Sequence, residues 1–291
     1  MPKAPHSFKR LVLGLQPTAP DRSVQLAAAL AEMLDLELLG LFLEDESLRD
    51  LAAFPFAREL RMLGGGWHPL NLEGLSRELE LAARSAERAF TQAVKHLSMH
   101  CQFEVRRGAV ATTIATVSQT SDIVLIVEPA SVAERTTAQF SRLLQAAFGS
   151  GAAVMIAPTR IARVRGPIVA IAAAADDPGI AVAATISQAV NETLIVLDIG
   201  QPAIDDERLR SLASETGLRV RHVVAKEAAH ADPATWARML RPLHERLIVM
   251  TRGVADERTV PILTAERQVP VLLLEPTALA PSAADASGST R

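Results

Sequence analysis

Residues 167–197 read PIVAIAAAADDPGIAVAATISQAVNETLIVL, and this stretch decides the fold. An apolar run at 167–173 is followed by Asp177 and Pro178, which are typical of the N-cap and first turn of a helix. The predicted helix leads into a second apolar run at 193–197. A short apolar run, a helix and another apolar run are typical of a βαβ unit around a parallel sheet.

The same alternation continues in both directions along the chain, and the order β-α-β-α-β-α-β-α-β is present twice. Near-continuous apolar runs suit strands that are buried on both faces of a sheet. Because such crossovers are right-handed, we expect an α/β protein with two doubly wound, five-stranded parallel sheets of the Rossmann-like type. The predicted strands are residues 10–15, 36–43, 102–105, 122–127 and 152–157, then 167–173, 193–197, 218–224, 246–250 and 269–274.

The repeats predict a first domain over residues 1–160 and a second, shorter domain over 161–276. The first repeat carries 37 more residues than the second between its second and third strands. Most of them form an excursion at 44–72, which a long helix predicted over 73–100 follows. The Ala-, Ser- and Pro-rich tail, residues 277–291, is typical of a disordered segment.

Composition argues against several classes of protein. The formal net charge is −3 over 291 residues and neither repeat is basic, so nucleic acid is not expected as a partner. The longest apolar stretches fall well short of the ~20 residues of a membrane-spanning helix, and no polybasic run would hold the chain on a membrane. Cys101 is the only cysteine, which fits a reducing, cytoplasmic location.

Residues 121–127, SDIVLIV, and residues 247–253, LIVMTRG, overlap the predicted fourth strands of the two repeats. They resemble the fourth strand of the universal stress protein family, in which Ala-Asp-Leu-Ile-Val-Met-Gly and Ile-Val-Met-Gly-Ser-Arg-Gly are typical. Together with the element order, they make residues 8–276 similar to a tandem universal stress protein. The resemblance implies an adenine nucleotide alpha hydrolase-like fold and a role in a stress response.

The ATP-binding members of that family have a glycine-rich loop after the fourth strand, Gly-x2-Gly-x9-Gly-Ser/Thr, and an aspartate at the end of the first strand. Glycine lets the backbone N–H groups approach the phosphates closely. Here Gln16 and Ala172 stand at the aspartate positions, and Glu128 and Pro129 follow the first fourth strand. An acid and a residue without an N–H both disfavour phosphate. Both nucleotide sites are therefore expected to be degenerate, and neither ATP nor AMP is expected as a cofactor.

Two functional hypotheses remain open. The first is a non-catalytic stress-response or regulatory protein that acts through protein contacts. The second is a small-molecule binding protein, for a nucleotide or another metabolite, whose remodelled cleft is covered by the excursion. Glycine-rich and nucleophile motifs of enzymes are absent, so no catalytic residue is predicted. The candidate ligand-binding residues are Gln16, Val127, Glu128, Asp176, Arg252 and Gly253.

Other residues have an ordinary structural interpretation beside a functional one. His96 and His100 share a face of the predicted helix and could ligate a metal, but exposed histidines at the helix end are preferred because no third ligand accompanies them. Cys101 is expected to be an inert thiol rather than a redox site. Asp176 and Asp177 are expected to cap a helix rather than form an acid pair. The expected solvated charges, with an anion or partner site as the alternative, are Arg106, Arg107, Arg135 and Arg142.

Contacts between chains or repeats are predicted at two places. The aromatic residues Phe54, Phe56 and Trp67 on the excursion fit either an interface or lid, or packing within their own domain. In the family, the edges of the fifth strands commonly form dimers. We therefore expect the fifth strands of the two repeats to meet within one chain as a pseudo-dimer, so that a monomer suffices and a homodimer is the alternative.

Overall fold

The structure of the protein is a computed structural model that describes residues 8–15, 21–61, 66–129, 131, 135, 137–200, 203–225, 232–254 and 259–276. The chain divides into two compact units, one of Arg10–Ala152 and one of Met1–Lys9 with Ala153–Arg291. The predicted tail lies outside the described residues. None of the helices in the described ranges has both the length and the apolar character needed to cross a membrane.

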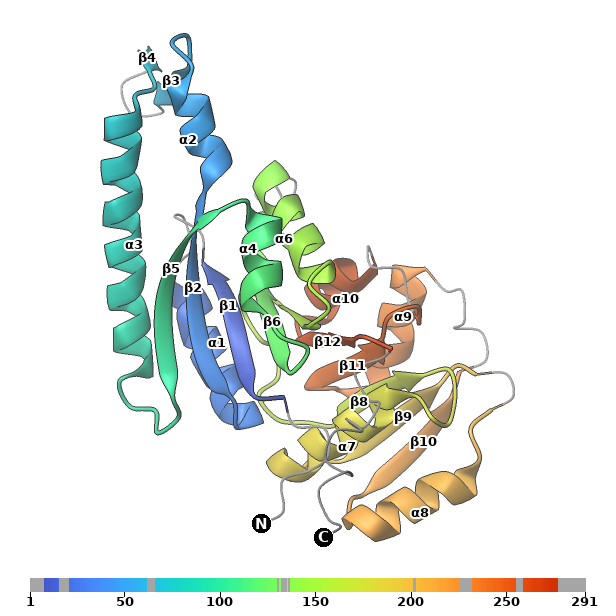
Figure 1. The fold of residues 1–291 in the computed structure, drawn as a ribbon. Coiled ribbons are helices and arrows are strands. Elements are labelled where there is room, and N and C mark those ends of the chain that lie inside the picture. The colour runs from blue at the N-terminus through green and yellow to red at the C-terminus, as the bar shows by residue number, and fades with distance from the viewer. Residues whose placement is uncertain are drawn as a thin grey trace, which may run out of the picture. The chain divides into compact units, whose positions relative to one another are not determined.

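The unit Arg10–Ala152 is built on a parallel sheet with the strand order β6-β1-β2-β5. Its strands are β1 (Arg10–Leu15), β2 (Glu37–Asp45), β5 (Cys101–Gly108) and β6 (Asp122–Val127). The helices α1 (Asp21–Leu34) and α3 (Leu72–Val94) pack together, as do α4 (Val110–Val117) and α6 (Ala138–Phe148), so that each pair covers one face (Figure 1). This is the doubly wound arrangement that the sequence predicts.

The excursion of the first repeat is more ordered than the sequence indicates. It contains a short helix, α2 (Glu46–Ala53), and a two-stranded antiparallel ribbon of β3 (Arg58–Arg61) and β4 (Gly66–Pro69). Figure 1 shows α2 and the ribbon at the amino-terminal end of α3, beyond the strands of their own sheet. We call the described residues of 46–72 the projection.

The described part of the second unit contains six strands in the order β10-β9-β8-β11-β12-β7. They are β7 (Ala153–Ala157), β8 (Ile168–Ala172), β9 (Leu194–Asp198), β10 (Val220–Val224), β11 (Leu247–Thr251) and β12 (Val271–Leu274). All pairs are parallel except β12 with β7, which run antiparallel with Leu272 opposite Met155. Thus β7, the fifth strand of the first repeat, pairs with the fifth strand of the second repeat.

Among the residues that the structure describes here, four helices and a 3-10 turn accompany this sheet. They are α7 (Pro178–Val190), α8 (Asp206–Thr216), α9 (Pro233–Leu240), the turn Arg241–Leu243 and α10 (Thr259–Arg267). Every residue of β8, β9, β11 and β12 is buried, as expected for strands covered on both faces. The predicted cap of α7 is confirmed, because Asp177 accepts a hydrogen bond of 2.8 Å from the Gly179 N–H and Pro178 occupies the first turn.

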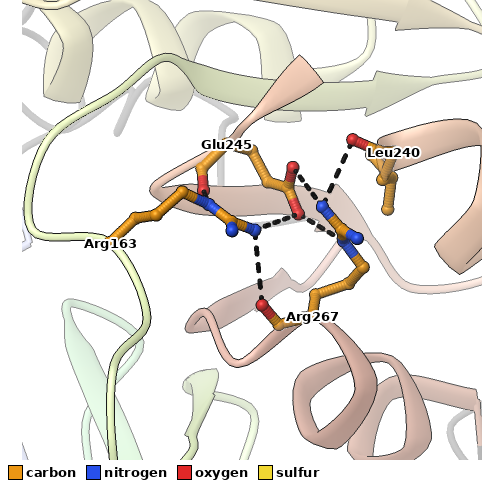
Figure 2. A network of polar contacts seen from close by, with 4 residues as sticks. All are labelled: Arg163, Leu240, Glu245 and Arg267. Carbon is orange, nitrogen blue, oxygen red and sulfur yellow. Dashed lines mark hydrogen bonds and ion pairs between the residues drawn. The ribbon is translucent and has the colours of Figure 1, made fainter. Parts of the chain in front are cut away.

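A buried ionic network lies at the amino-terminal end of β11 (Figure 2). Glu245 has no exposed surface, and its carboxylate accepts two hydrogen bonds from Arg267, at 2.7 and 3.1 Å. Arg163, from the segment between β7 and β8, donates to the backbone carbonyl of Glu245 at 2.8 Å. The three residues therefore tie the segment after β7 to the start of β11 and the end of α10.

Candidate functional site

The second unit has a topological switch point between β8 and β11. From β8 the chain proceeds to β9 on one side, whereas β11 is followed by β12 on the other side. In open α/β sheets, ligands bind in the crevice outside the carboxyl ends of the strands at such a point. The predicted residues Asp176, Arg252 and Gly253 all follow one of these two strands, so the structure brings them to the same edge of the sheet.

Asp177 and Thr251 form a hydrogen bond across this switch point. The Asp177 carboxylate accepts a hydrogen bond of 2.6 Å from the Thr251 hydroxyl, at the end of β11, as well as the bond from Gly179 N–H. The same carboxylate atom therefore joins the amino terminus of α7 to β11. A helix amino terminus favours an anion, and here the protein supplies that anion itself.

Arg252 and Gly253 form the turn that leaves β11. The Arg252 backbone N–H donates to the Leu274 carbonyl at 2.9 Å, and its guanidinium forms an ion pair of 2.7 Å with Glu275. Gly253 has a φ of +91°, a left-handed conformation that a residue with a side chain rarely adopts. In the Arg-Gly pair that resembles the family motif, Gly253 therefore allows the tight turn and Arg252 contacts β12.

An open groove of about 460 Å³ lies beside Asp177, between α7 and α8. We call it the α7–α8 groove. Its charged lining residues are Asp176, Asp177 and Arg208. The remaining lining residues are small or apolar: Ala175, Pro178, Ile180, Ala181, Leu209, Leu212 and Pro276.

Residues that sequence reasoning did not identify hold the start of α8 beside this groove. Asp198, fully buried at the end of β9, accepts hydrogen bonds from the backbone N–H groups of Gly200 (2.8 Å) and Ile204 (2.6 Å). His222 on β10 places Nε2 3.2 Å from Asp198 and Nδ1 2.5 Å from Asp206. The cluster joins the ends of β9 and β10 to the start of α8, the helix that carries Arg208 and Leu209.

The first unit has the equivalent switch point between β1 and β6, and Glu128 is the first residue after β6. Its side chain is only 3% exposed, and this burial raises the pKa of the carboxyl to about 7, although the nearby Arg135 opposes the shift. Val127 is half-buried at the end of β6, and Gln16 lies outside the described residues. A carboxyl group, rather than a glycine-rich turn, therefore begins the segment after β6.

The structure also places the other residues considered from the sequence. Helix α3 ends at Val94 rather than at residue 100, so the prediction that His96 and His100 share a helix face was wrong. Cys101 is half-buried, and burial raises the pKa of its thiol, which favours the inert interpretation. Ion pairs join Arg106 to Glu104, Arg107 to Glu44 and Arg142 to Asp45. Across the described residues, no three His, Cys, Asp or Glu side chains are grouped so as to hold a metal ion.

Comparison with known proteins supports the fold. No family model and no curated protein matches the chain. A universal stress protein structure from Archaeoglobus fulgidus DSM 4304 is similar with a TM-score of 0.65 and 12% sequence identity, covering 93% of this chain and 97% of that one. A functionally unknown protein from Pseudomonas aeruginosa PAO1 is similar with a TM-score of 0.53 and 13% identity, covering 94% of each chain. The chain therefore has the α/β fold of the universal stress proteins.

Proposed function

We propose that this chain is a non-catalytic, cytoplasmic stress-response protein that acts through contact with a partner protein and does not hold ATP as the ATP-binding universal stress proteins do. The observation that carries the proposal is that a carboxyl group stands at both switch points. Asp177 stands at the one in the second unit, and Glu128 at the one in the first.

In the second unit, charge and geometry both disfavour a phosphate. Asp177 already accepts the hydrogen bond from Gly179 N–H that a phosphate oxygen would need. Two like charges at 4 Å repel by about 1 kcal/mol in water and by several times more near a protein surface. A triphosphate brought to the amino terminus of α7 would therefore have to displace or neutralise Asp177.

In the first unit, the buried Glu128 carboxyl adds a further obstacle that depends on pH. Because its pKa is raised to about 7, the group is mainly neutral below that pH and mainly negative above it. Above about pH 7 a phosphate next to Glu128 would meet a carboxylate with little water to screen it.

We expect calorimetric titration with Mg-ATP or AMP to show no binding tighter than about 1 mM, and the pure protein not to hydrolyse ATP. The variant Asp177→Asn keeps a side-chain acceptor for Gly179 N–H but removes the charge. It should bind ATP about tenfold more tightly than the unmodified protein, which corresponds to about 1.4 kcal/mol. The control Glu207→Gln removes an exposed charge from the first turn of α8 and should leave the weak affinity unchanged. Micromolar ATP binding by the unmodified protein would contradict the proposal.

The α7–α8 groove supports a second candidate function, the binding of a small molecule. Its volume of about 460 Å³ falls in the range of ligand sites, about 300–1,000 Å³. The lining combines two acidic residues, Asp176 and Asp177, with one basic residue, Arg208, and with apolar residues that include the buried Ile180 and Leu209, so acidic groups outnumber basic ones. Such a lining suits a small amine with an apolar body, because the ammonium can pair with a carboxylate while the body covers the apolar residues.

A panel of small amines screened by thermal shift tests this second candidate. A ligand that raises the melting temperature of the unmodified protein should lose its effect in Leu212→Trp, because a larger side chain at this half-buried position fills the groove. The control Leu81→Trp changes an exposed leucine on α3 and should leave the shift intact. A shift that persists in Leu212→Trp would place the ligand elsewhere.

A further inference from the structure

The projection exposes more aromatic surface than is usual for so small a segment. The exposed fractions are 63% for Phe54, 89% for Phe56 and 64% for Trp67. By contrast Trp236, the other tryptophan of the chain, is only 2% exposed. Leu48, Leu51 and Leu72 of the same segment are also exposed, at 36%, 51% and 44%. The projection therefore exposes six large apolar side chains to solvent within one short segment, and we call these six residues the patch.

Backbone hydrogen bonds order the main chain that carries these side chains. Phe54 caps α2 by donating its N–H to the Leu51 carbonyl at 3.2 Å, and Ala57 N–H donates to the Phe54 carbonyl at 3.0 Å. Leu70 N–H donates to the Ala57 carbonyl at 2.9 Å, which joins the end of β4 to the turn before β3. Trp67 stands opposite Leu60 in the antiparallel ribbon. An aromatic patch on a fixed backbone loses little conformational freedom on binding, which favours association.

The exposed aromatic side chains supply about half of the area that one partner contributes to a standard interface. A fully exposed aromatic side chain offers about 150–250 Å², so the three aromatics together offer roughly 300–550 Å². The three leucines and the neighbouring polar atoms extend this area toward the ~800 Å² that each partner contributes to a standard interface. Exposed patches that reach the upper part of the ~300–600 Å² range of monomers commonly mark interaction sites.

The charges around the patch suit a partner with the same surface. Arg58 and Glu59 are neighbours on β3, and Glu73 and Arg77 form an i, i+4 ion pair on α3. Two basic and two acidic groups allow opposite charges to meet across a two-fold axis, where a surface of one sign would repel its copy. We propose that the projection binds the projection of a second copy of this chain, forming a symmetric dimer through Phe54, Phe56 and Trp67. This dimer is independent of the function proposed above.

Light scattering and sedimentation of the full chain test the dimer. At about 100 µM the unmodified protein should have twice the 31.1 kDa mass of one chain. Phe56→Asp and Trp67→Asp should each raise the dissociation constant by about 30-fold or more, as expected for central aromatic residues of an interface. The control Val164→Asp adds the same charge at a valine that is 74% exposed in the other unit, and should leave the dimer intact.

Hydrogen exchange locates the contact directly, because amides of residues 48–61 and 66–72 should become more protected as the protein concentration rises. A single-chain mass at about 100 µM would overturn the proposal, as would a dimer that both variants leave unchanged. A monomer that sediments with anionic lipid vesicles, and loses that binding in Trp67→Asp, would also overturn it by assigning the patch to a membrane surface.

Discussion

Replacing Glu245 with alanine is expected to lower the free energy of unfolding by about 3–5 kcal/mol, because it leaves the largely buried guanidinium of Arg267 without its carboxylate. Glu245 is fully buried, and the Arg267 side chain that binds it is only 11% exposed. Arg267 would keep one weak hydrogen bond, of 3.4 Å, to the Leu240 carbonyl. Urea denaturation at neutral pH, followed by circular dichroism, measures the change.

Two further variants show whether the loss comes from the network. Glu266→Ala removes an exposed carboxylate from the neighbouring position on α10 and should change the unfolding free energy by no more than about 0.5 kcal/mol. The double variant Glu245→Ala/Arg267→Ala should lose less than the sum of the two single changes, since the second removes the charge that the first leaves unpaired. Strict additivity would mean that Glu245 and Arg267 are not energetically coupled, despite the hydrogen bonds between them that Figure 2 shows.

Replacing Glu128 with glutamine is expected to stabilise the protein by about 3 kcal/mol at pH 8 and by less than about 0.5 kcal/mol near pH 4.5. The raised pKa, about 7 against 4.5, means that the folded state binds the proton more tightly than the unfolded state. The unmodified protein therefore loses stability as pH rises from 4.5 to 7, because ionisation is easier in the unfolded chain. Glutamine has nearly the same shape and no charge to bury, so its advantage grows over the same pH range.

Urea denaturation of both proteins from pH 4.5 to 8 provides the measurement. Glu80→Gln is the matched control, since its carboxylate is exposed on α3 and the substitution should give no pH-dependent difference. A Glu128→Gln effect that is equal at pH 4.5 and pH 8 would mean that burial does not raise the pKa of this carboxyl.

Much of the fold can be predicted because local signals agree with the packing. Asp177 and Pro178 define the start of α7, and the apolar runs in the second repeat match β8 to β12 within one or two residues at each end. The prediction was wrong at the end of α3, where Leu97 continues the apolar helical spacing past Val94. There the tertiary structure overrides the local helical pattern, because the chain must leave the helix before Cys101, which pairs with Leu38 at the start of β5. The short α2 and the four-residue strands β3 and β4 have too few residues for a clear periodicity.

The candidate site could be predicted only where its residues are close in sequence. Glu128 was identified because it directly follows an apolar strand, and Asp176 because it precedes a helix. The hydrogen bond from Thr251 to Asp177 joins residues 74 positions apart, and His222 contacts Asp198 across 24 positions. Such pairs depend on the order of strands in the sheet, which periodicity alone does not supply. The buried state of Glu128, and hence its raised pKa, likewise depends on the tertiary packing around it.

The antiparallel pairing of β7 with β12 bears on how the polypeptide can be dissected. A gene fragment that starts at residue 161 would omit β7 and leave the backbone groups of β12 on that side without partners. A bare, wholly apolar edge of this kind promotes aggregation. A fragment that starts before Ala153 retains β7, which covers that edge. A fragment made to isolate the second half should therefore begin before β7, although β7 belongs to the first repeat.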